Sequence, residues 1–198
     1  MGRPPTISRG DITDALIRVV AEQGLDAVSI RTVAREAGVS IGSVQYHFAT
    51  KDDLLLGAYE HAINNVVARA AQFPDPEEHP AAYIRALLCQ LLPLDDDRTA
   101  EARVAIAFTA RSVYSPRLTE LYALGYRALV DAVAGALVRA VERGEAADGV
   151  EPERDAVQAA ALADGLAWHA LCAPGELAVA DALAALDAHL ARLLPGRD

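Results

Sequence analysis

The sequence predicts an all-α protein of roughly nine helices, in which a small three-helix domain (residues 1–52) precedes a larger helical domain (residues 53–198). Three observations predict this fold class. Apolar residues recur at helical spacing through most of the chain, and no stretch alternates as a half-buried strand does. Proline and glycine punctuate the chain between these stretches. The 198 residues, 53% hydrophobic and 23% charged, suffice for a globular protein with two cores.

The first three helices are predicted to contain a helix-turn-helix motif. A first helix is expected over residues 12–24, and Ser29 is a candidate N-cap for the second. Gly38 stands where a helix commonly ends in a left-handed residue, and Ser40 then caps a third helix over residues 41–48. Two short helices around such a turn are typical of DNA-binding proteins, in which the second helix of the motif enters the major groove.

The outward surface of the third helix favours contact with DNA over an ordinary helical hairpin with a polar face. It contains no acidic residue, and Gln45 can pair with an adenine edge while Ser43 can bond several bases. Gly42 lets the backbone approach the duplex, and Tyr46 and His47 are long enough to reach phosphates. The predicted DNA contacts are Arg31, Thr32, Ser40, Ile41, Gly42, Ser43, Gln45, Tyr46, His47 and Lys51.

The next helix begins with a capping box, in which Thr50 is the N-cap and Asp53 the N3 residue. Lys51, the only lysine of the chain, stands beside this helix N-terminus, which itself attracts anions. Here the chain resembles the TetR family of transcriptional repressors. The resemblance rests on ITDALIRVVAEQG and SIRTVAREAGVSIGSVQYHFATKDDLL, and covers roughly residues 8–60. The family pattern Tyr-x-Phe-x-x-Lys-x-x-Leu is matched by Tyr46, Phe48, Lys51 and Leu54.

The remainder of the chain is similar to the BetI-like C-terminal subgroup of that family, at the level of its helices. Helices are predicted over residues 51–72, 81–92, 99–114, 115–144 and 152–172, followed by a last helix after the segment 173–176. The stretches PDPEEHP and LDDDR are predicted to be loops. Residues 99–114 are expected to form a central buried helix.

The net charge of −10 is divided unequally between the two domains. Residues 1–51 carry a net charge of +1, whereas residues 52–198 carry −11. An acidic body repels DNA and thereby helps to orient the molecule on the duplex. Arg3 and Arg9 lie in or beside an N-terminal arm that either reaches the minor groove or is a solvated terminus.

The last two predicted helices carry stripes suited to dimerisation. Leucines recur at spacings of four and three along the last helix, as in a coiled-coil seam, although both stripes can also pack within one chain. A single helix-turn-helix reads only a few base pairs, and operators usually require a two-fold protein. The resemblance also implies a dimer built from these two helices. The predicted interface residues are Val157, Ala161, Gly165, Leu183, Leu186, Leu190 and Leu193.

The middle of the second domain is predicted to bind a small-molecule effector. Most aromatic residues fall on helices expected to surround one core, where a cavity would be mainly apolar with a few polar groups. Asp164 beside Trp168 suits a cationic effector through charge and cation–π contact. The alternative for each polar residue is an internally hydrogen-bonded core position. The predicted effector contacts are Tyr59, Phe108, Thr109, Tyr122, Tyr126, Asp164, Trp168 and His169.

The sequence gives little support to other functional classes. It contains no glycine-rich phosphate loop, nucleophile elbow or HExxH motif, and we predict no catalytic residue, cofactor or metal site. A non-catalytic carrier and, least favoured, a helical enzyme are the alternatives to a dimeric repressor that binds a palindromic operator and is released by its effector. No uninterrupted apolar run reaches membrane-spanning length, so we expect a cytoplasmic protein. Cys89 and Cys172 are expected to be reduced thiols, with a redox switch as the alternative.

Overall fold

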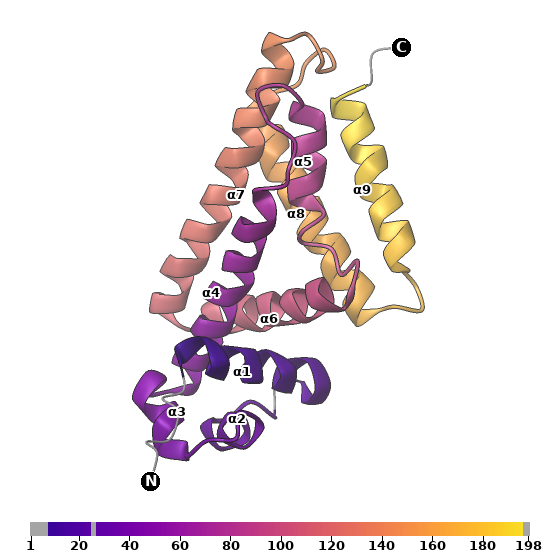
Figure 1. Ribbon diagram of the computed structural model, residues 1–198. Helices are drawn as coiled ribbons and strands as arrows, with labels where there is room; N and C mark the ends of the chain where they lie inside the picture. The colour runs from indigo at the N-terminus through magenta and orange to yellow at the C-terminus, as the bar shows by residue number, and fades with distance from the viewer. Residues whose placement is uncertain (1–7, 25–26, 196–198) are drawn as a thin grey trace.

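Helices α1 to α3 form a head at one end of the molecule, and α4 leads from this head into a larger helical body (Figure 1). The computed structural model describes residues 8–24 and 27–195, and in these residues it has nine α-helices and no strand, as predicted. They are α1 (Arg9–Gln23), α2 (Ile30–Glu36), α3 (Ile41–His47), α4 (Lys51–Ala70), α5 (Pro80–Leu88), α6 (Asp96–Ser112), α7 (Pro116–Glu142), α8 (Pro152–Cys172) and α9 (Val179–Leu193).

The N-caps of α2, α3 and α4 are those that the sequence predicts. The side chains of Ser29, Ser40 and Thr50 each accept a hydrogen bond from the backbone N–H three residues later. Gly38 has φ +67°, the left-handed conformation that lets the chain reverse between α2 and α3. The first helix begins earlier than predicted, because Ser8 forms a second capping box there.

The head has its own core, and α4 is part of it. Val44 and Phe48, the two inward anchors around α3, are both fully buried. Phe48 lies so close to Gly57 on α4 that a Cβ atom at this glycine would be 2.5 Å from the Phe48 Cε1 atom. The C-terminal end of α3 is therefore packed directly against α4. Val104 on α6 is fully buried in the same cluster, so the head also rests on α6.

Helix α6 lies across the molecule between the head and the body (Figure 1). It begins at Asp96, before the predicted residue 99, because the Asp95 side chain accepts a hydrogen bond from the Arg98 N–H and acidic residues in a first turn favour the helix dipole. Helix α5 ends at Leu88, four residues before the prediction, and the chain continues in tight turns. The packing partners of α6 are α1, α4, α7 and α8.

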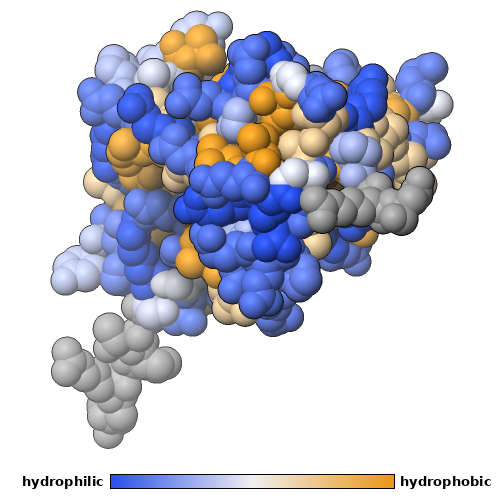
Figure 2. Space-filling model, turned by 90° about the horizontal axis from the view of Figure 1, so that it is seen from above, coloured by the Kyte–Doolittle hydropathy of each residue, from blue (hydrophilic) through white to orange (hydrophobic). Residues whose placement is uncertain are grey.

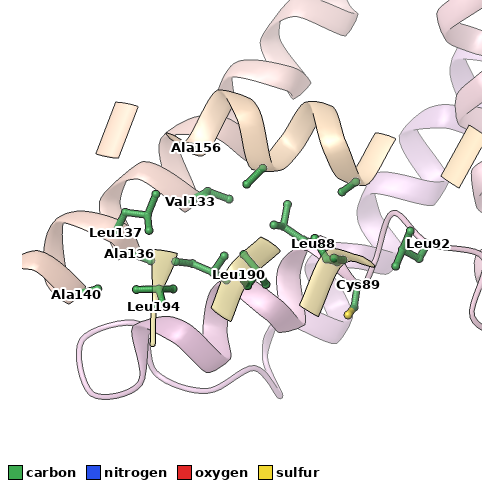
Figure 3. Close-up of a cluster of buried hydrophobic side chains, with 14 of the residues drawn as sticks. Leu88, Cys89, Leu92, Val133, Ala136, Leu137, Ala140, Ala156, Leu190 and Leu194 are labelled. Carbon is green, nitrogen blue, oxygen red and sulfur yellow. The ribbon is translucent and has the colours of Figure 1, made fainter. Parts of the chain in front are cut away.

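The body packs around an alanine-rich face of α8. Six alanines on this helix are buried, and their small side chains let α7 and α9 approach closely. Figure 3 shows leucine, valine and alanine side chains of α5, α7 and α8 meeting those of Leu190 and Leu194. Leu186 and Leu190 are 0% and 6% exposed within this single-chain core. We predicted these two residues as dimer contacts, and the structure corrects this, because their side chains are already covered by their own chain.

Helix α7 is, among the described residues, the one helix long and apolar enough to cross a membrane by length and composition alone. The charged Arg127 and Asp131 interrupt it, and it packs against α5, α6 and α8. Seen from above, the body is largely hydrophilic, with hydrophobic side chains gathered in small patches (Figure 2). The charged residues and packing partners of α7 are those of an amphipathic helix in a bundle.

Candidate DNA-binding surface and effector pocket

The surface of α3 projects polar and aromatic side chains away from the head. With Val44 and Phe48 buried, Gln45 is exposed and Tyr46 is 86% exposed, with its ring edge-to-face against His47. Ile41 at the start of the helix is 43% exposed, which suits contact with a thymine methyl group. This arrangement presents a mixed hydrogen-bonding and apolar surface of the dimensions of one helix, which a major groove accepts.

The serine and threonine candidates have a structural role as well. The Ser40 Oγ lies 2.8 Å from the Ser43 Oγ, and the Ser29 Oγ lies 2.8 Å from the Thr32 Oγ1. Each pair stands at a helix N-terminus, with Ser40 exposed and Ser43 half-buried. Arg31 is exposed on α2. The Ser29 and Ser40 hydroxyl groups therefore cap α2 and α3, and Ser40 is in addition a predicted DNA contact.

The N-terminus of α4 completes this surface, and its two acidic residues form ion pairs with arginines of the body. Lys51 is exposed at the first position of the helix. The Arg111 Nε donates to the Asp52 Oδ1 at 2.8 Å, and the Arg117 Nη1 donates to the Asp53 Oδ1 at 2.9 Å. Hydrogen bonds from Thr50 and Arg117 lower the pKa of Asp53. Two arginines from the body thus neutralise the carboxylates beside the predicted phosphate contact.

Of the two arginines of the predicted N-terminal arm, Arg9 lies within the described residues. Arg3 lies outside the described residues. Arg9 is the first residue of α1, where its Nη2 donates to the Glu60 Oε2 at 3.0 Å and its guanidinium carbon lies 5.1 Å from the centre of the Phe48 ring. Arg9 therefore braces α1 against α3 and α4.

A mainly apolar cavity of about 360 Å³ lies in the body. Residues of α4, α6, α7 and α8 form its wall, together with Leu87 on α5 and, just after that helix, Gln90 and Leu91. Of the predicted effector residues, those that line it are Tyr59, Thr109, Tyr122, Tyr126, Asp164 and Trp168.

Two predicted effector residues do not line the cavity, and we remove them from the proposed contacts. Phe108 is fully buried behind the wall, where its ring stacks on that of Tyr59 with centroids 4.0 Å apart. His169 is exposed and follows Trp168, so the helical rotation of about 100° per residue turns it away. Tyr114, another aromatic residue of this domain, is 80% exposed and does not line the cavity.

Asp164 is the charged group at one end of the cavity. Although the residue keeps an exposed edge, the apolar surroundings of its carboxyl group raise its pKa to about 6. Burial, together with the nearby Tyr122 and Asp164, raises the pKa of Tyr59 to about 12. Burial and Asp164 also raise the pKa of Tyr122. A carboxylate among three tyrosines and Trp168 offers both charge and aromatic faces to an organic cation.

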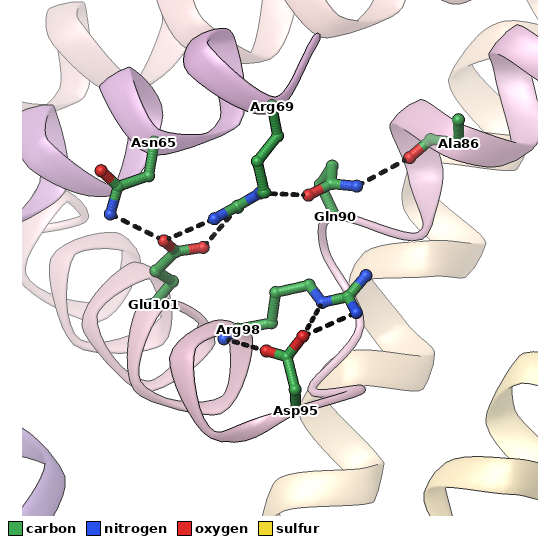
Figure 4. Close-up of polar contacts among 7 residues, drawn as sticks. All are labelled: Asn65, Arg69, Ala86, Gln90, Asp95, Arg98 and Glu101. Atoms are coloured by element: carbon green, nitrogen blue, oxygen red, sulfur yellow. Dashed lines mark hydrogen bonds and ion pairs between the residues drawn. The ribbon is translucent and has the colours of Figure 1, made fainter. Parts of the chain in front are cut away.

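Glu101 and Gln90, which the sequence analysis missed, stand at a second polar part of the wall. Glu101 is 7% exposed, and its Oε2 accepts from the Arg69 Nη2 at 2.6 Å while its Oε1 accepts from the Arg69 Nη1 and the Asn65 Nδ2 (Figure 4). The Arg69 Nε donates to the Gln90 Oε1 at 2.6 Å. Helical spacing places Glu101 four residues before Ala105, on the face that Thr109 also occupies, which is the signal that identifies it.

The outer face of α8 remains a candidate interface. Val157 and Trp168 are 44% and 43% exposed, Ala161 is exposed, and a Cβ atom on Gly165 would meet nothing within 4 Å. Leu183 and Leu193 on α9 are half-buried. These residues, unlike Leu186 and Leu190, have surface left to bury against a second copy.

Within the described residues, no group of three or more histidine, cysteine or acidic side chains is arranged to hold a metal ion. Cys89 is buried and Cys172 is exposed, and both are free thiols. Burial raises the pKa of Cys89, which makes this thiol unreactive.

Comparison with known proteins identifies both parts of the chain. A family model for bacterial regulatory proteins of the tetR family matches residues 12–58, and one for the C-terminal part of BetI-type transcriptional repressors matches residues 80–195. The regulator BetI of Burkholderia thailandensis is 29% identical over 167 residues, which are 81% of this chain and 80% of BetI.

Solved structures agree with the family models. A transcriptional regulator from Rhodococcus sp. Rha1 is 34% identical, with a TM-score of 0.79 over 96% of this chain and 97% of that one. A regulator from Saccharomonospora viridis, solved in complex with choline, shares the fold at 24% identity, with a TM-score of 0.75 over 91% of this chain and 93% of that one.

Proposed function

Because the chain belongs to the TetR family of bacterial regulatory proteins and carries a BetI-type C-terminal domain, we propose that it is a repressor that binds a palindromic operator as a homodimer. Members of this family are DNA-binding transcriptional regulators, so the chain is a regulator and not an enzyme. Its place of action is then the bacterial cytoplasm, where the operator is found, and its partners are duplex DNA, a second copy and an effector.

The observation that carries the proposal is the acid-free surface of α3 beside Lys51. We assign Gln45 and Ile41 to base edges, and Tyr46, His47 and Lys51 to phosphates; the exposure of Gln45, Ile41, Tyr46 and Lys51 supports this assignment. The remaining contacts we propose are Arg31, Thr32, Ser40, Gly42 and Ser43.

We propose that the effector carries a cation on an apolar body. The support is the mainly apolar cavity with Asp164 among Tyr59, Tyr122, Tyr126 and Trp168. Its binding lowers operator affinity, and by linkage the operator lowers effector affinity by the same factor.

The experiment is selection of duplexes from a random pool by the full-length protein, followed by titration at several salt concentrations. Lys51→Ala should weaken binding to every duplex. It should also reduce the slope of log K against log salt concentration by about 1, or about 2 for a dimer, because phosphate contacts release counterions. Gln45→Ala should instead relax preference at one base pair in each half-site.

Arg192→Ala is the matched control, since it removes the same charge from an exposed position on α9. It should leave the salt dependence and the base preference unchanged. If the wild-type protein selects no duplex, the proposed function is wrong. If Lys51→Ala changes base preference at a constant salt slope, the division of roles within the surface is wrong.

A further inference from the structure

The hydrogen-bonded cluster of Asn65, Arg69, Gln90 and Glu101, here called the clamp, fastens α4 to α6 (Figure 4). Both carboxylate oxygens of Glu101 are occupied by donors from α4. The amide of Gln90 is also occupied, because it accepts from Arg69 and its Nε2 donates to the Ala86 carbonyl oxygen. A ligand cation that takes over the two-bond contact with Glu101 must therefore displace the Arg69 guanidinium.

The clamp stands between two hollows. Glu101 lines the effector cavity, and together with Arg69 and Asn65 it also lines a second cleft that reaches Asp14 and Ile17 on α1. The cleft leaves open space beside the Asn65, Arg69 and Glu101 side chains, into which Arg69 can swing when its pair with Glu101 is broken.

Movement at the clamp reaches the recognition helix by two short routes. Glu101 lies one turn before Val104, whose side chain is buried in the head core. Arg69 lies on α4, the helix on which Phe48 is seated against Gly57. The other end of α4 is held by the pairs Asp52–Arg111 and Asp53–Arg117, so the clamp is a polar tie at the end of α4 that lies away from the head.

Two carboxylates, those of Asp164 and Glu101, line the effector cavity. Asp164 acts electrostatically on Tyr59, and Glu101 is paired with Arg69, ten residues further along α4. At 1.5 Å per residue these two positions on α4 are about 15 Å apart along the helix. The wall between them is mainly aliphatic and aromatic, including Ile63 and Val66.

We propose that the inducing effector is an elongated dication, with one charge at Asp164 and the second replacing the Arg69 guanidinium at Glu101, so that binding opens the clamp. This inference rests on the proposed function, because the opened clamp acts by lowering operator affinity. A monocation of the same length binds at Asp164 and leaves the clamp closed. The clamp therefore separates compounds that bind from compounds that induce.

The test uses 1,10-diaminodecane and decylamine, which differ only in the second ammonium group. Binding is followed by the fluorescence of Trp168, the sole tryptophan, and repression by affinity for the duplex that the wild-type protein selects. Both amines should bind, and only the diamine should lower duplex affinity, by about 5–150-fold as is typical of such coupling. Equal effects of the two amines on the duplex, or failure of the diamine to bind, would overturn the proposal.

Variants separate the clamp from general stability. Glu101→Gln keeps the size of the side chain but weakens the clamp, so it should lower duplex affinity without any amine and abolish the difference between the two amines. The double variant Arg69→Met with Glu101→Met leaves no unpaired buried charge and should behave in the same way. Normal duplex affinity in that double variant would show that an unpaired charge, rather than the clamp, was responsible.

Asp187→Asn is the matched control, because Arg85 and Asp187 form a similar two-bond pair between α5 and α9. It should leave duplex affinity and the response to the diamine within about two-fold of wild type, as exposed pairs contribute little. A wild-type protein that selects no duplex would contradict the proposed function itself. A wild-type protein that selects a duplex and ignores the diamine would contradict only the dication.

Discussion

At the scale of single residues, Asp164 shows how a binding site costs stability. A carboxyl group whose pKa is raised by its surroundings holds its proton more tightly in the folded chain than in the unfolded one. Its charge is therefore unfavourable to folding at neutral pH, and the same charge is what an effector cation would neutralise. A carboxylate in such surroundings is therefore better explained by a binding role than by a role in stabilising the fold.

Asp164→Asn should therefore raise the melting temperature at pH 7.5. The folded pKa of about 6 lies above the ordinary aspartate value of 3.8, so the cost of the carboxylate is absent near pH 4 and develops as the pH rises through this window. The difference in melting temperature between variant and wild type should vanish near pH 4. Calorimetry at both pH values measures it, and a variant less stable than wild type at pH 7.5 would show that Asp164 has a structural partner.

At the scale of helices, the contact between α3 and α4 depends on one absent methyl group. A helix normally gains about 0.5–1 kcal/mol when an exposed interior glycine becomes alanine. At Gly57 the new Cβ would overlap the Phe48 ring, and Phe48 is fully buried. The close approach of the two helices thus outweighs the helix propensity of this position.

Gly57→Ala is expected to destabilise the protein by about 1–3 kcal/mol, the usual cost of overpacking a core. Gly135→Ala is the matched control, since a Cβ atom added at this α7 position would meet nothing within 4 Å, and it should be neutral or stabilising. Chemical denaturation of both variants provides the comparison. If the two substitutions had the same effect, Phe48 would be free to move and the joint between α3 and α4 would be loose.

The first four helices were predictable because their determinants are local. Ser29, Ser40 and Thr50 act on amides three residues away, and the left-handed conformation at Gly38 needs no distant partner. The body was harder to predict, because apolar periodicity does not say which neighbour covers a stripe. Leu186 and Leu190 follow the same pattern that an interface would, and only the crossing of α5, α7, α8 and α9 puts them in one core. Glu101 was missed because its partners, Asn65 and Arg69, lie on α4, more than thirty residues earlier in the chain.

At the scale of the whole molecule, the exposed side of α8 is the surface on which we expect two copies to meet. Its residues are apolar or small at a regular helical spacing, from Val157 through Ala161 to Trp168. Small residues let two helices approach closely, and a dimer would bring the two heads to the same side of one duplex, as successive half-sites require.

Ala161→Asp should give a folded monomer with poor operator affinity, because it places an unpaired charge in the interface. Leu186→Asp should instead lose helical structure, because that side chain is fully buried in its own chain. Ala123→Asp, on the exposed face of α7, should remain a folded dimer. Light scattering with circular dichroism distinguishes these states, and a dimeric Ala161→Asp variant would exclude this part of α8 from the interface.

The seating of Phe48 on Gly57 also decides where such proteins can be recombined. A chimera joined at residue 52 would cut the first turn of α4 from the half-helix that packs in the head, and would pair a foreign phenylalanine or glycine with an unmatched neighbour. A graft that extends through Ala58 keeps this contact within one parent. Mismatches then remain at Val104 and at the Arg9–Glu60 pair, so engineers who wish to change the DNA specificity of this scaffold should transfer those two body positions together with the head.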